Sequence, residues 1–591
     1  MFLTRAIKWL GLGSLTLQSG ALASGKPNII MVLTDDQDVH MHSLDYMPFV
    51  QKYLINEGTT FTRHYCTIAV CCPSRASLLT GMAAHNTNVT DILMPYGGYP
   101  KWVAEGLNDD YLPLWLQEAG YSTYYVGKLF NQHDVSNYAD FPAKGWTQSD
   151  FILDPYTYEY ENAHFTRNGE KPVSYKGQYS PDVTADKAYD FLDQALEDDD
   201  QPFFLSIAPI APHANMVIEP YSGTPPKYAA RHAHLFKDYK IPRTENFNPD
   251  EPSGVSWISQ LPKLNDSVIE YNDEYQRCRL RSLQAVDEMV EGVVKRLEAA
   301  GQLENTYIFY TTDNGYHISQ HRMHPGKECG FDTDINIPMI VRGPGVERGV
   351  KSHAVTAHSD LAPTFLHLAG AAPRPRIDGS AMPLVKGDEG KTEHVNIEFW
   401  GNAAGEGKYG FSGEWGVING TVNGYQNNTY KGLRLIGEGA NLYYSVWCTN
   451  EHELYDVGAD PGQVRNLFDP RHGLLASRFS VAGRGLEAVV TRLDALMMVL
   501  KSCRGDSCRD PWAVIHPGES GVRSLADALG ADFDEFYQGQ PKVRFDRCEL
   551  GYIRGSEGPQ DVQSYRTGGN GGIAGESDQV PFLRHDWSSW V

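Results

Sequence analysis

The chain has 591 residues and a formal net charge of −23. By length alone it would hold about four domains, but the pattern of its elements indicates fewer. So negative a surface excludes nucleic acid as a partner held through its phosphates. It also repels anions at long range, so any anion site must be made basic by nearby side chains.

Residues 1–23 have the pattern of a secretory signal peptide, which is removed from the mature protein. Arg5 and Lys8 make the start basic, an apolar stretch follows, and Ala-Leu-Ala offers a cleavage site. No later segment approaches the roughly 20 apolar residues that span a bilayer. We therefore expect no membrane span and a protein secreted to the extracellular space, a cell-wall space, or a lysosome-like or vacuole-like compartment. Four glycosylation sequons fit that route, at Asn88, Asn265, Asn419 and Asn427.

Five apolar runs predict buried strands of a parallel sheet, and helical patterns lie between them. One helical pattern begins at Leu112 and another at Leu280. The repeated strand–helix order indicates an α/β sheet that is covered on both faces. The five strands are expected at residues 27–34, 121–127, 202–209, 306–312 and 337–343.

Polar residues that can do chemistry follow the first four of these strands. Sites in open α/β sheets form at the carboxyl ends of the strands. We therefore expect these residues to converge in one site and to make residues 26–375 one large domain. They are Asp35 and Asp36, Lys128, His213, and Asp313 with Asn314.

Asp35, Asp36, Asp313 and Asn314 offer hard oxygen ligands to a metal ion. Such ligands suit calcium or magnesium, whereas zinc prefers nitrogen and sulfur. The amide ligand and the number of oxygens favour one calcium ion over magnesium.

Beyond about residue 390 the pattern changes to aromatic and glycine-rich strands and turns. This pattern predicts a smaller antiparallel sheet within residues 390–591. Nine cysteines in an exported chain predict that most pair as disulfides, with one thiol left over. Cys503 and Cys508 are the pair expected from local spacing, although C-x4-C can also bind metal; the other pairings stay open.

The segment AVCCPSRASLLTG, residues 69–81, resembles the signature of the sulfatases, C-x-P-S-R followed by a short helix and T-G. Supporting motifs cover nearly the whole mature chain, among them TDDQ, VGK, APH, TTDNGYH and HPGK. Counting back from Pro73 places the reactive cysteine at Cys71 and makes Cys72 the variable residue. Within the family, the chain most resembles fungal and algal arylsulfatases and N-acetylglucosamine-6-sulfatases.

The resemblance implies an α/β, alkaline-phosphatase-like fold: a large, mixed, mostly parallel sheet flanked by helices. A smaller C-terminal domain, residues 390–591, would pack on the catalytic domain. The resemblance also implies formylglycine at position 71, made from Cys71 by a modification enzyme during maturation. One hydroxyl of the hydrated aldehyde would attack sulfur, and the second would expel sulfate. This residue would also be a calcium ligand.

The family pattern assigns roles to the other motif residues. Arg75 would stabilise the hydrate, and Lys128 and Lys327 would bind the sulfate oxygens. His213 would protonate the leaving oxygen. Metal and cations together would supply electrostatic catalysis.

One position departs from the pattern. Many sulfatases have histidine two residues after the first lysine, whereas this chain has Phe130 there. The base that assists sulfate release therefore stays open, and His317 is a candidate, although a lone loop histidine is more often structural. Asn131 and His317 are both expected to contact the substrate.

The predicted function is hydrolysis of sulfate monoesters, above all aryl sulfates, to a phenol or alcohol and inorganic sulfate. Action on sulfated sugars, as an N-acetylglucosamine-6-sulfatase, is the alternative. A metal-dependent phosphatase or phosphodiesterase would share the aspartates but would carry serine or threonine as nucleophile and a second metal site. A non-catalytic sulfoester-binding protein would not need the cysteine, the arginine and both lysines together.

Overall fold

The computed structural model describes residues 25–197, 201–218, 221–385, 392–410, 417–418, 421–422, 425–518 and 521–565. The predicted signal peptide and the sequon at Asn419 lie outside these residues. None of the helices in the described ranges is long and apolar enough to cross a membrane.

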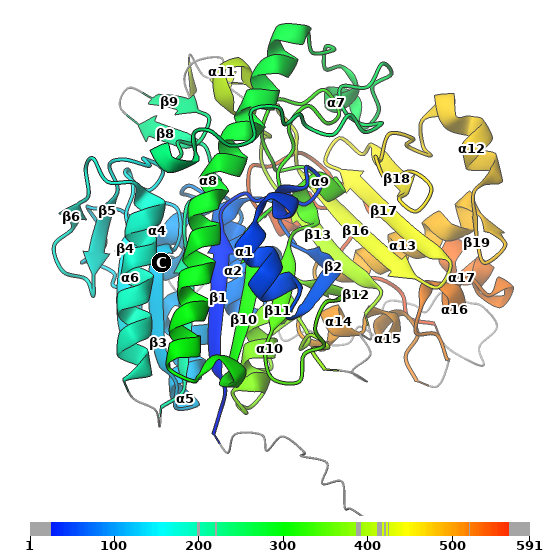
Figure 1. Cartoon of the computed structure of the whole chain (residues 1–591). Coiled ribbons are helices and arrows are strands. Elements are labelled where there is room, and N and C mark those ends of the chain that lie inside the picture. Colours follow the sequence, from blue (N-terminus) through cyan, green and yellow to red (C-terminus); the bar gives the residue numbers. More distant parts are fainter. Residues whose placement is uncertain are drawn as a thin grey trace, which may run out of the picture.

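A ten-stranded sheet forms the centre of the molecule (Figure 1). In order across the sheet, its strands are β12 (Val350–Ala357), β2 (Thr59–Tyr65), β11 (Met339–Arg342), β10 (Thr306–Thr312), β1 (Asn28–Thr34), β7 (Phe203–Ala208), β3 (Ser122–Lys128), β4 (Gln148–Ile152), β5 (His164–Arg167) and β6 (Val173–Ser174). The central strand β1 pairs in parallel with β10 and β7, and β3 pairs in parallel with β7. The predicted mixed, mostly parallel sheet is confirmed.

The fifth predicted strand, β11, does not run parallel as expected. It pairs antiparallel with both β10 and β2. For β11 to run parallel to β10, the chain would have to cross back to the end of the sheet at which β10 begins. The chain between β10 and β11 instead holds only the single-turn helix α9 (Asp332–Ile335), so β11 starts from the edge where β10 ends.

The two faces of the sheet follow from the alternation of side chains along β1. Ile29 and Met31 belong to one apolar core, and Ile30 and Val32 belong to the other. The first core includes residues of α2 (Cys71–Thr80), α5 (Leu112–Glu118) and α10 (Leu361–Leu368). The second includes residues of α6 (Ser180–Leu196) and α8 (Asp266–Ala299), which lie side by side in front of the sheet in Figure 1.

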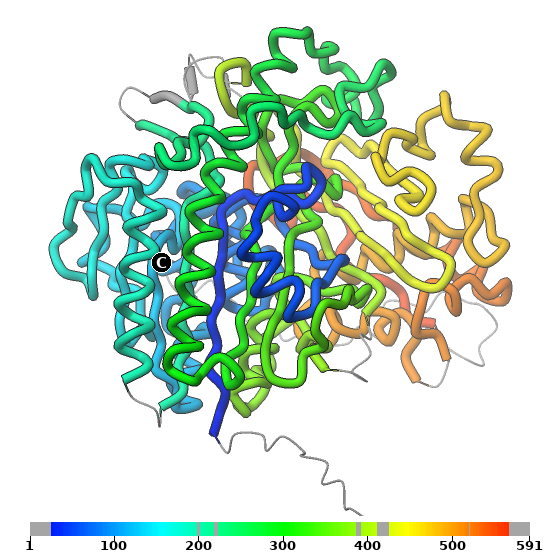
Figure 2. Tube along the Cα trace, viewed as in Figure 1, coloured from blue at the N-terminus to red at the C-terminus, as the bar shows by residue number. Residues whose placement is uncertain are grey.

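A second, antiparallel sheet lies beside the first, and Figure 2 follows the chain into it in yellow. Its strands, in order, are β13 (His394–Phe399), β16 (Tyr430–Gly437), β17 (Ala440–Trp447) and β18 (His452–Asp456). Helix α13 (Leu486–Leu500) shares an apolar core with β16 and β17. The predicted smaller antiparallel sheet is confirmed, while the boundary between residues 375 and 390 stays a prediction.

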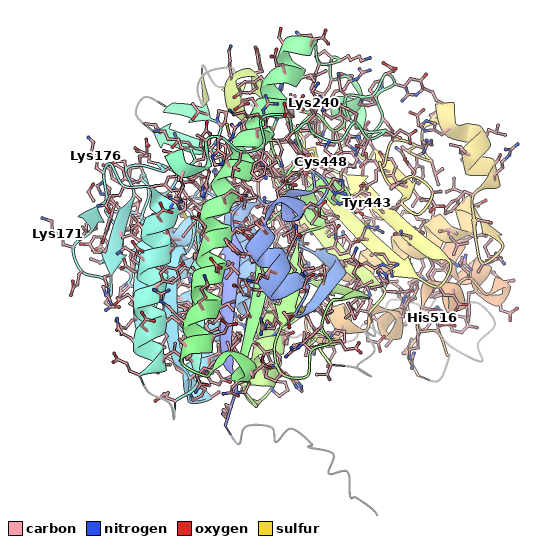
Figure 3. The ribbon with its side chains drawn as sticks, viewed as in Figure 1. Lys171, Lys176, Lys240, Tyr443, Cys448 and His516 are labelled. Carbon is pink, nitrogen blue, oxygen red and sulfur yellow. A yellow bond between two sulfur atoms is a disulfide. The ribbon has the colours of Figure 1, made fainter. Side chains whose placement is uncertain are left out.

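Two disulfides form in this second region. The predicted Cys503–Cys508 bond is present, and Cys448, labelled in Figure 3, pairs with Cys548. The expectation that most cysteines pair is wrong, because the other five are free and buried. A buried free cysteine such as Cys72 packs as a small apolar side chain and needs no sulfur partner.

The outer edge of the large sheet ends in a very short strand. β6 is only two residues long, and both of its residues are exposed. Lys171 and Lys176 flank it at the margin of the molecule (Figure 3).

A buried ion cluster joins the second sheet to helix α3 (Ala84–Thr87) of the first region. Glu398 on β13 accepts from His85 in α3 at 2.9 Å and from the Lys431 ammonium on β16, also at 2.9 Å. All three side chains are almost inaccessible to water. A buried charge without its partner is costly, so this cluster helps to hold the second sheet against α3.

Glu398→Gln tests that connection. We expect it to lower the free energy of unfolding by about 3 kcal/mol, because it leaves the His85 charge buried without a carboxylate and leaves Lys431 only the more distant Glu557, at 3.6 Å. Urea unfolding followed by tryptophan fluorescence measures the loss. The matched control is Glu304→Gln, which removes an exposed carboxylate from Arg348 and should cost less than about 1 kcal/mol. Equal losses in the two variants would contradict the role of the cluster.

Candidate active site at the strand ends

The carboxyl ends of β1 and β10 bring four polar residues together. In the parallel register Thr34 lies beside Thr312, so the residues that follow them emerge side by side. The backbone N–H of Asp36 donates to Asp313 Oδ1 at 3.0 Å, and Asn314 Nδ2 donates to Asp36 Oδ1 at 2.7 Å. Asp36 has φ 68°, in the left-handed region. Such strain is typical of functional sites.

Helix α2 places its first residue, Cys71, in the same cluster. Cys71 Sγ lies 3.5 Å from Asp35 Oδ1 and 3.4 Å from Lys327 Nζ. Its neighbour Cys72 instead belongs to the apolar core beneath the helix. Successive residues of a helix face different directions, so only one of the adjacent cysteines reaches the polar cluster.

Three buried cations surround these carboxylates. Arg75 is one helical turn after Cys71 and donates through Nε to Asp313 Oδ2 at 2.9 Å. Lys128 Nζ lies 2.6 Å from Asp35 Oδ2. Lys327 Nζ lies 2.5 and 2.7 Å from the two oxygens of Asp36.

Lys128 reaches the cluster because β3 approaches β7 closely just before it. Gly127 has φ 105°, and a Cβ there would lie 2.1 Å from the carbonyl oxygen of Ala208. Only glycine fits this close approach of two backbones. The glycine of the VGK motif therefore positions the lysine that follows it.

The pKa values reflect the competition between burial and neighbouring charge. Burial favours the neutral form of Asp313, but the charges of Arg75, Lys128 and Lys327 outweigh burial and hold its pKa below the usual range. For Asp35, burial and then the charge of Asp313 raise the pKa. A bound cation would favour the ionised form of Asp35.

The donor set fits a hard cation. Asp35, Asp36, Cys71 and His213 offer ligand atoms that all lie within 4.8 Å of one another. The buried Asn314 Oδ1 has no hydrogen-bond partner among the described residues, so it retains lone pairs for a ligand. The oxygen donors of the set, from Asp35, Asp36 and Asn314, suit calcium or magnesium.

His213 lies beside the cluster after the end of β7. Its Nδ1 donates to the carbonyl oxygen of Ala214 at 2.9 Å, so Nδ1 carries a hydrogen. Its Nε2 lies 3.6 Å from Asp36 Oδ2. When it is protonated, Nε2 can donate a proton into the site.

Asn131 and His317 make side-chain hydrogen bonds to residues outside the carboxylate cluster. Asn131 Nδ2 donates to the hydroxyl of Tyr158 at 2.8 Å. His317 Nδ1 lies 2.9 Å from both carboxylate oxygens of Asp334. Phe130 lies in the apolar core, where its ring packs on Trp102, so it contributes nothing polar to the site.

Three residues around the site were not predicted from the sequence. Tyr158 contacts His213, Lys128 and Asn131; Asp334 orients His317; and Glu406 Oε1 lies 4.0 Å from Lys327 Nζ. None follows a strand of the predicted set directly. The aromatic run YTYEY, which contains Tyr158, is the one local signal.

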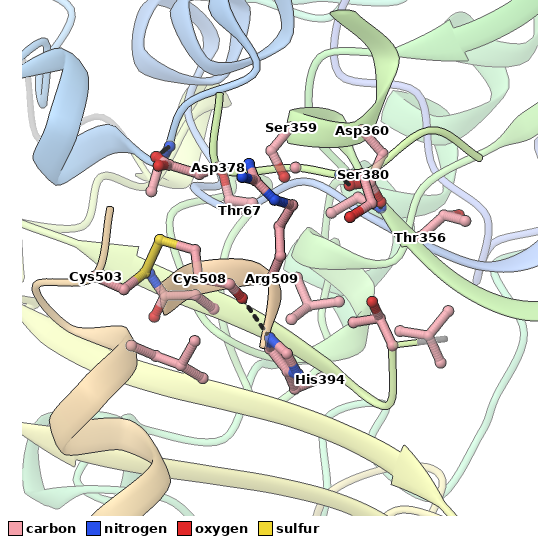
Figure 4. A pocket seen from close by; sticks show the side chains of 18 residues that line it. Thr67, Thr356, Ser359, Asp360, Asp378, Ser380, His394, Cys503, Cys508 and Arg509 are labelled. Atoms are coloured by element: carbon pink, nitrogen blue, oxygen red, sulfur yellow. Dashed lines mark hydrogen bonds between the residues drawn. A yellow bond between two sulfur atoms is a disulfide. The ribbon is translucent and has the colours of Figure 1, made fainter. Parts of the chain in front are cut away.

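A separate cavity lies away from these strand ends (Figure 4). Its lining residues include Asp378, His394, Arg509 and the Cys503–Cys508 disulfide, and none of the predicted site residues. Its volume of about 50 Å³ suits one or a few waters. It is too small for a sulfate ester with an aromatic ring or a sugar, so the strand-end cluster is the candidate active site.

Comparison with known proteins agrees with this geometry. The family model described as Sulfatase matches residues 27–371. An arylsulfatase from Volvox carteri is 38% identical over 92% of this chain and 84% of that protein. An N-acetylglucosamine-6-sulfatase from Capra hircus is 31% identical over 86% of this chain and 89% of its own length. A solved structure in complex with its substrate D-glucosamine-2-N,6-O-disulfate shares the fold, with a TM-score of 0.59 at 22% identity over 76% of this chain and 94% of that one. The chain therefore belongs to the sulfatase family and is a sulfuric ester hydrolase.

Proposed function

We propose that this sulfatase hydrolyses aryl sulfates, with Cys71 converted to formylglycine as the source of the nucleophile and one calcium ion as cofactor. The observation that carries the proposal is the position of Cys71. Its Sγ lies among Asp35, Asp36 and Lys327, whereas Cys72 is in the apolar core. Conversion would supply an oxygen nucleophile and a route for releasing sulfate.

Asp35, Asp36, Asp313 and Asn314, with the modified residue 71, would hold the calcium ion. Calcium there would polarise a bound oxygen and stabilise developing negative charge. With calcium bound, three carboxylates and three cations leave the pocket with a net charge of about +2. A sulfate monoester carries one negative charge, so the pocket attracts it although the protein as a whole is strongly negative.

The other site residues bind the substrate and transfer a proton. Lys128 and Lys327 bind the sulfate oxygens, and Arg75 stabilises the nucleophilic residue and holds Asp313. As the bond between sulfur and the leaving oxygen breaks, His213 Nε2 gives its proton to that oxygen, which departs as a neutral phenol. Asn131 and His317 contact the rest of the substrate.

Cys71 is almost completely buried in the folded chain. We infer that the modification enzyme acts before folding closes α2 over the sheet. The predicted leader would direct the chain into the secretory pathway, where this maturation takes place, and then to its exported location.

The substrate class is tested by comparing 4-nitrophenyl sulfate, 4-nitrophenyl phosphate and 6-sulfated N-acetylglucosamine. We expect the highest kcat/KM on the aryl sulfate, because a phenol is a better leaving group than a sugar alcohol. Turnover of the sugar alone would favour the glucosamine-6-sulfatase alternative. Faster turnover of the phosphate would indicate a phosphatase.

The metal assignment is tested with Asp313→Ala. Loss of this carboxylate removes one calcium ligand and the partner of Arg75, so kcat should fall by about 10³-fold or more. Bound calcium, measured by atomic emission after dialysis, should fall well below one ion per chain. Asp332→Ala, which removes the buried partner of Arg434 outside the site, is the control and should retain calcium. Stoichiometric calcium in Asp313→Ala would refute the assignment.

The nucleophile is tested with the two neighbouring cysteines. Mass spectrometry of the peptide should show an aldehyde at position 71 and an unmodified thiol at position 72. Cys71→Ser keeps one hydroxyl to attack sulfur but lacks the second that expels sulfate. A slowly hydrolysed sulfate ester on that serine should therefore add its mass to the intact protein.

Cys72→Ala is the matched control for this experiment. It removes a thiol from the core without touching the polar cluster, so it should keep its activity and lose some stability. Sustained full turnover by Cys71→Ser would show that the nucleophile lies elsewhere.

A further inference from the structure

Tyr158 makes contacts with three of the residues to which the proposed function gives a role. Its ring stacks on the imidazole of His213, with ring centroids 4.1 Å apart and planes 20° apart. Lys128 Nζ lies 4.7 Å from the centre of the same ring. Its hydroxyl accepts from Asn131 Nδ2 at 2.8 Å.

The backbone around Tyr158 is held against the same histidine. The backbone N–H of Met216 donates to the carbonyl oxygen of Tyr158 at 3.1 Å. Two residues further on, the Tyr160 hydroxyl donates to the carbonyl oxygen of His213 at 2.8 Å. Both the ring and the main chain of His213 are therefore fixed by one short segment, residues 158–160.

Two side chains bear on the orientation of this imidazole: the stacked ring of Tyr158 and the Asp36 carboxylate, whose Oδ2 lies 3.6 Å from Nε2. His213 Nδ1 donates to the carbonyl of the next residue, which fixes one point of the ring. The stacked phenol fixes the plane, so Nε2 points in one direction. The negative face of an aromatic ring also attracts cations, and the Lys128 ammonium lies near this ring.

We propose that Tyr158 is a positioning residue for proton transfer to the leaving group. The inference rests on the proposed function, in which His213 Nε2 gives its proton to the leaving oxygen. Tyr158 does not exchange a proton itself. It holds the imidazole in the plane from which the proton reaches that oxygen.

This role predicts on which substrates kcat/KM falls most when the ring of Tyr158 is removed. A weakly acidic phenol needs a proton as it leaves, whereas 4-nitrophenol leaves readily as an anion. Tyr158→Leu should therefore lower kcat/KM about threefold on 4-nitrophenyl sulfate and about 30-fold to 100-fold on phenyl and 4-methoxyphenyl sulfate. His213→Ala should show the same steep dependence on the leaving group, and the double variant should be no steeper than His213→Ala alone.

Tyr158→Phe separates the ring from the hydroxyl. It keeps the stacking and the cation contact and loses only the bond from Asn131, so kcat/KM should stay within about threefold of wild type on every substrate. Tyr121→Leu is the matched control. Tyr121 is a buried tyrosine that directly precedes the first residue of β3, whereas Lys128 is the last residue of that strand. Its loss should lower thermal stability without changing the dependence on the leaving group.

The outcomes are distinguishable. Equal losses on all aryl sulfates in Tyr158→Leu would reduce Tyr158 to a packing residue and overturn the inference. If the leucine variant does not fold, as thermal unfolding will show, Tyr158→Met fills the space without a ring and decides the question on the same substrates. A wild-type enzyme that cleaves none of the aryl sulfates would contradict the proposed function itself.

Discussion

Three carboxylates and three cations are buried together at the carboxyl ends of the strands of the large sheet. The arrangement of the surrounding elements depends on balancing their charges. Moving an ion out of water costs several kcal/mol, which only close partners of opposite sign offset. Asp35 lies against Lys128, Asp36 against Lys327, and Asp313 against Arg75. The partners come from a strand, a loop and a helix that are far apart in the sequence. The charge balance is therefore satisfied only in the complete fold.

The parallel register controls this balance. Thr34 and Thr312 are paired, so the acidic residues that follow them emerge at one level. A shift of one residue would turn each side chain to the other face of the sheet. Cores on both faces oppose such a shift, because Ile29 and Ile30 already occupy opposite sides. The apolar cores thus hold the carboxylates in position for a cation.

Much of this architecture was predictable from the sequence, because strongly apolar strands carry their own signal. The runs around β1, β3, β7 and β10 are buried on both faces and appear as continuous apolar stretches. β2 was not predicted because its sequence, TTFTRHY, mixes polar and apolar residues. The direction of β11 depends on the connection that precedes it, which no local sequence pattern reveals.

The same distinction applies to the site. Asp35, Lys128 and Asp313 follow predicted strands, so their proximity could be expected. Tyr158 lies between β4 and β5, and its contact with His213 arises only from the folded arrangement of two loops. Glu406 reaches Lys327 from the C-terminal part of the chain, nearly 80 residues away. Such contacts depend on tertiary packing and produce no periodic pattern in the sequence.

The short outer strand β6 has a consequence for the behaviour of the protein in concentrated solution. A sheet with an open edge offers unpaired N–H and C=O groups to any other extended chain. Here the edge ends after two residues, and the charged side chains of Lys171 and Lys176 stand on either side of it. A second molecule would have to desolvate both ammonium groups to gain a few backbone hydrogen bonds. The ten-stranded sheet is thus protected at this edge from growing into an intermolecular aggregate.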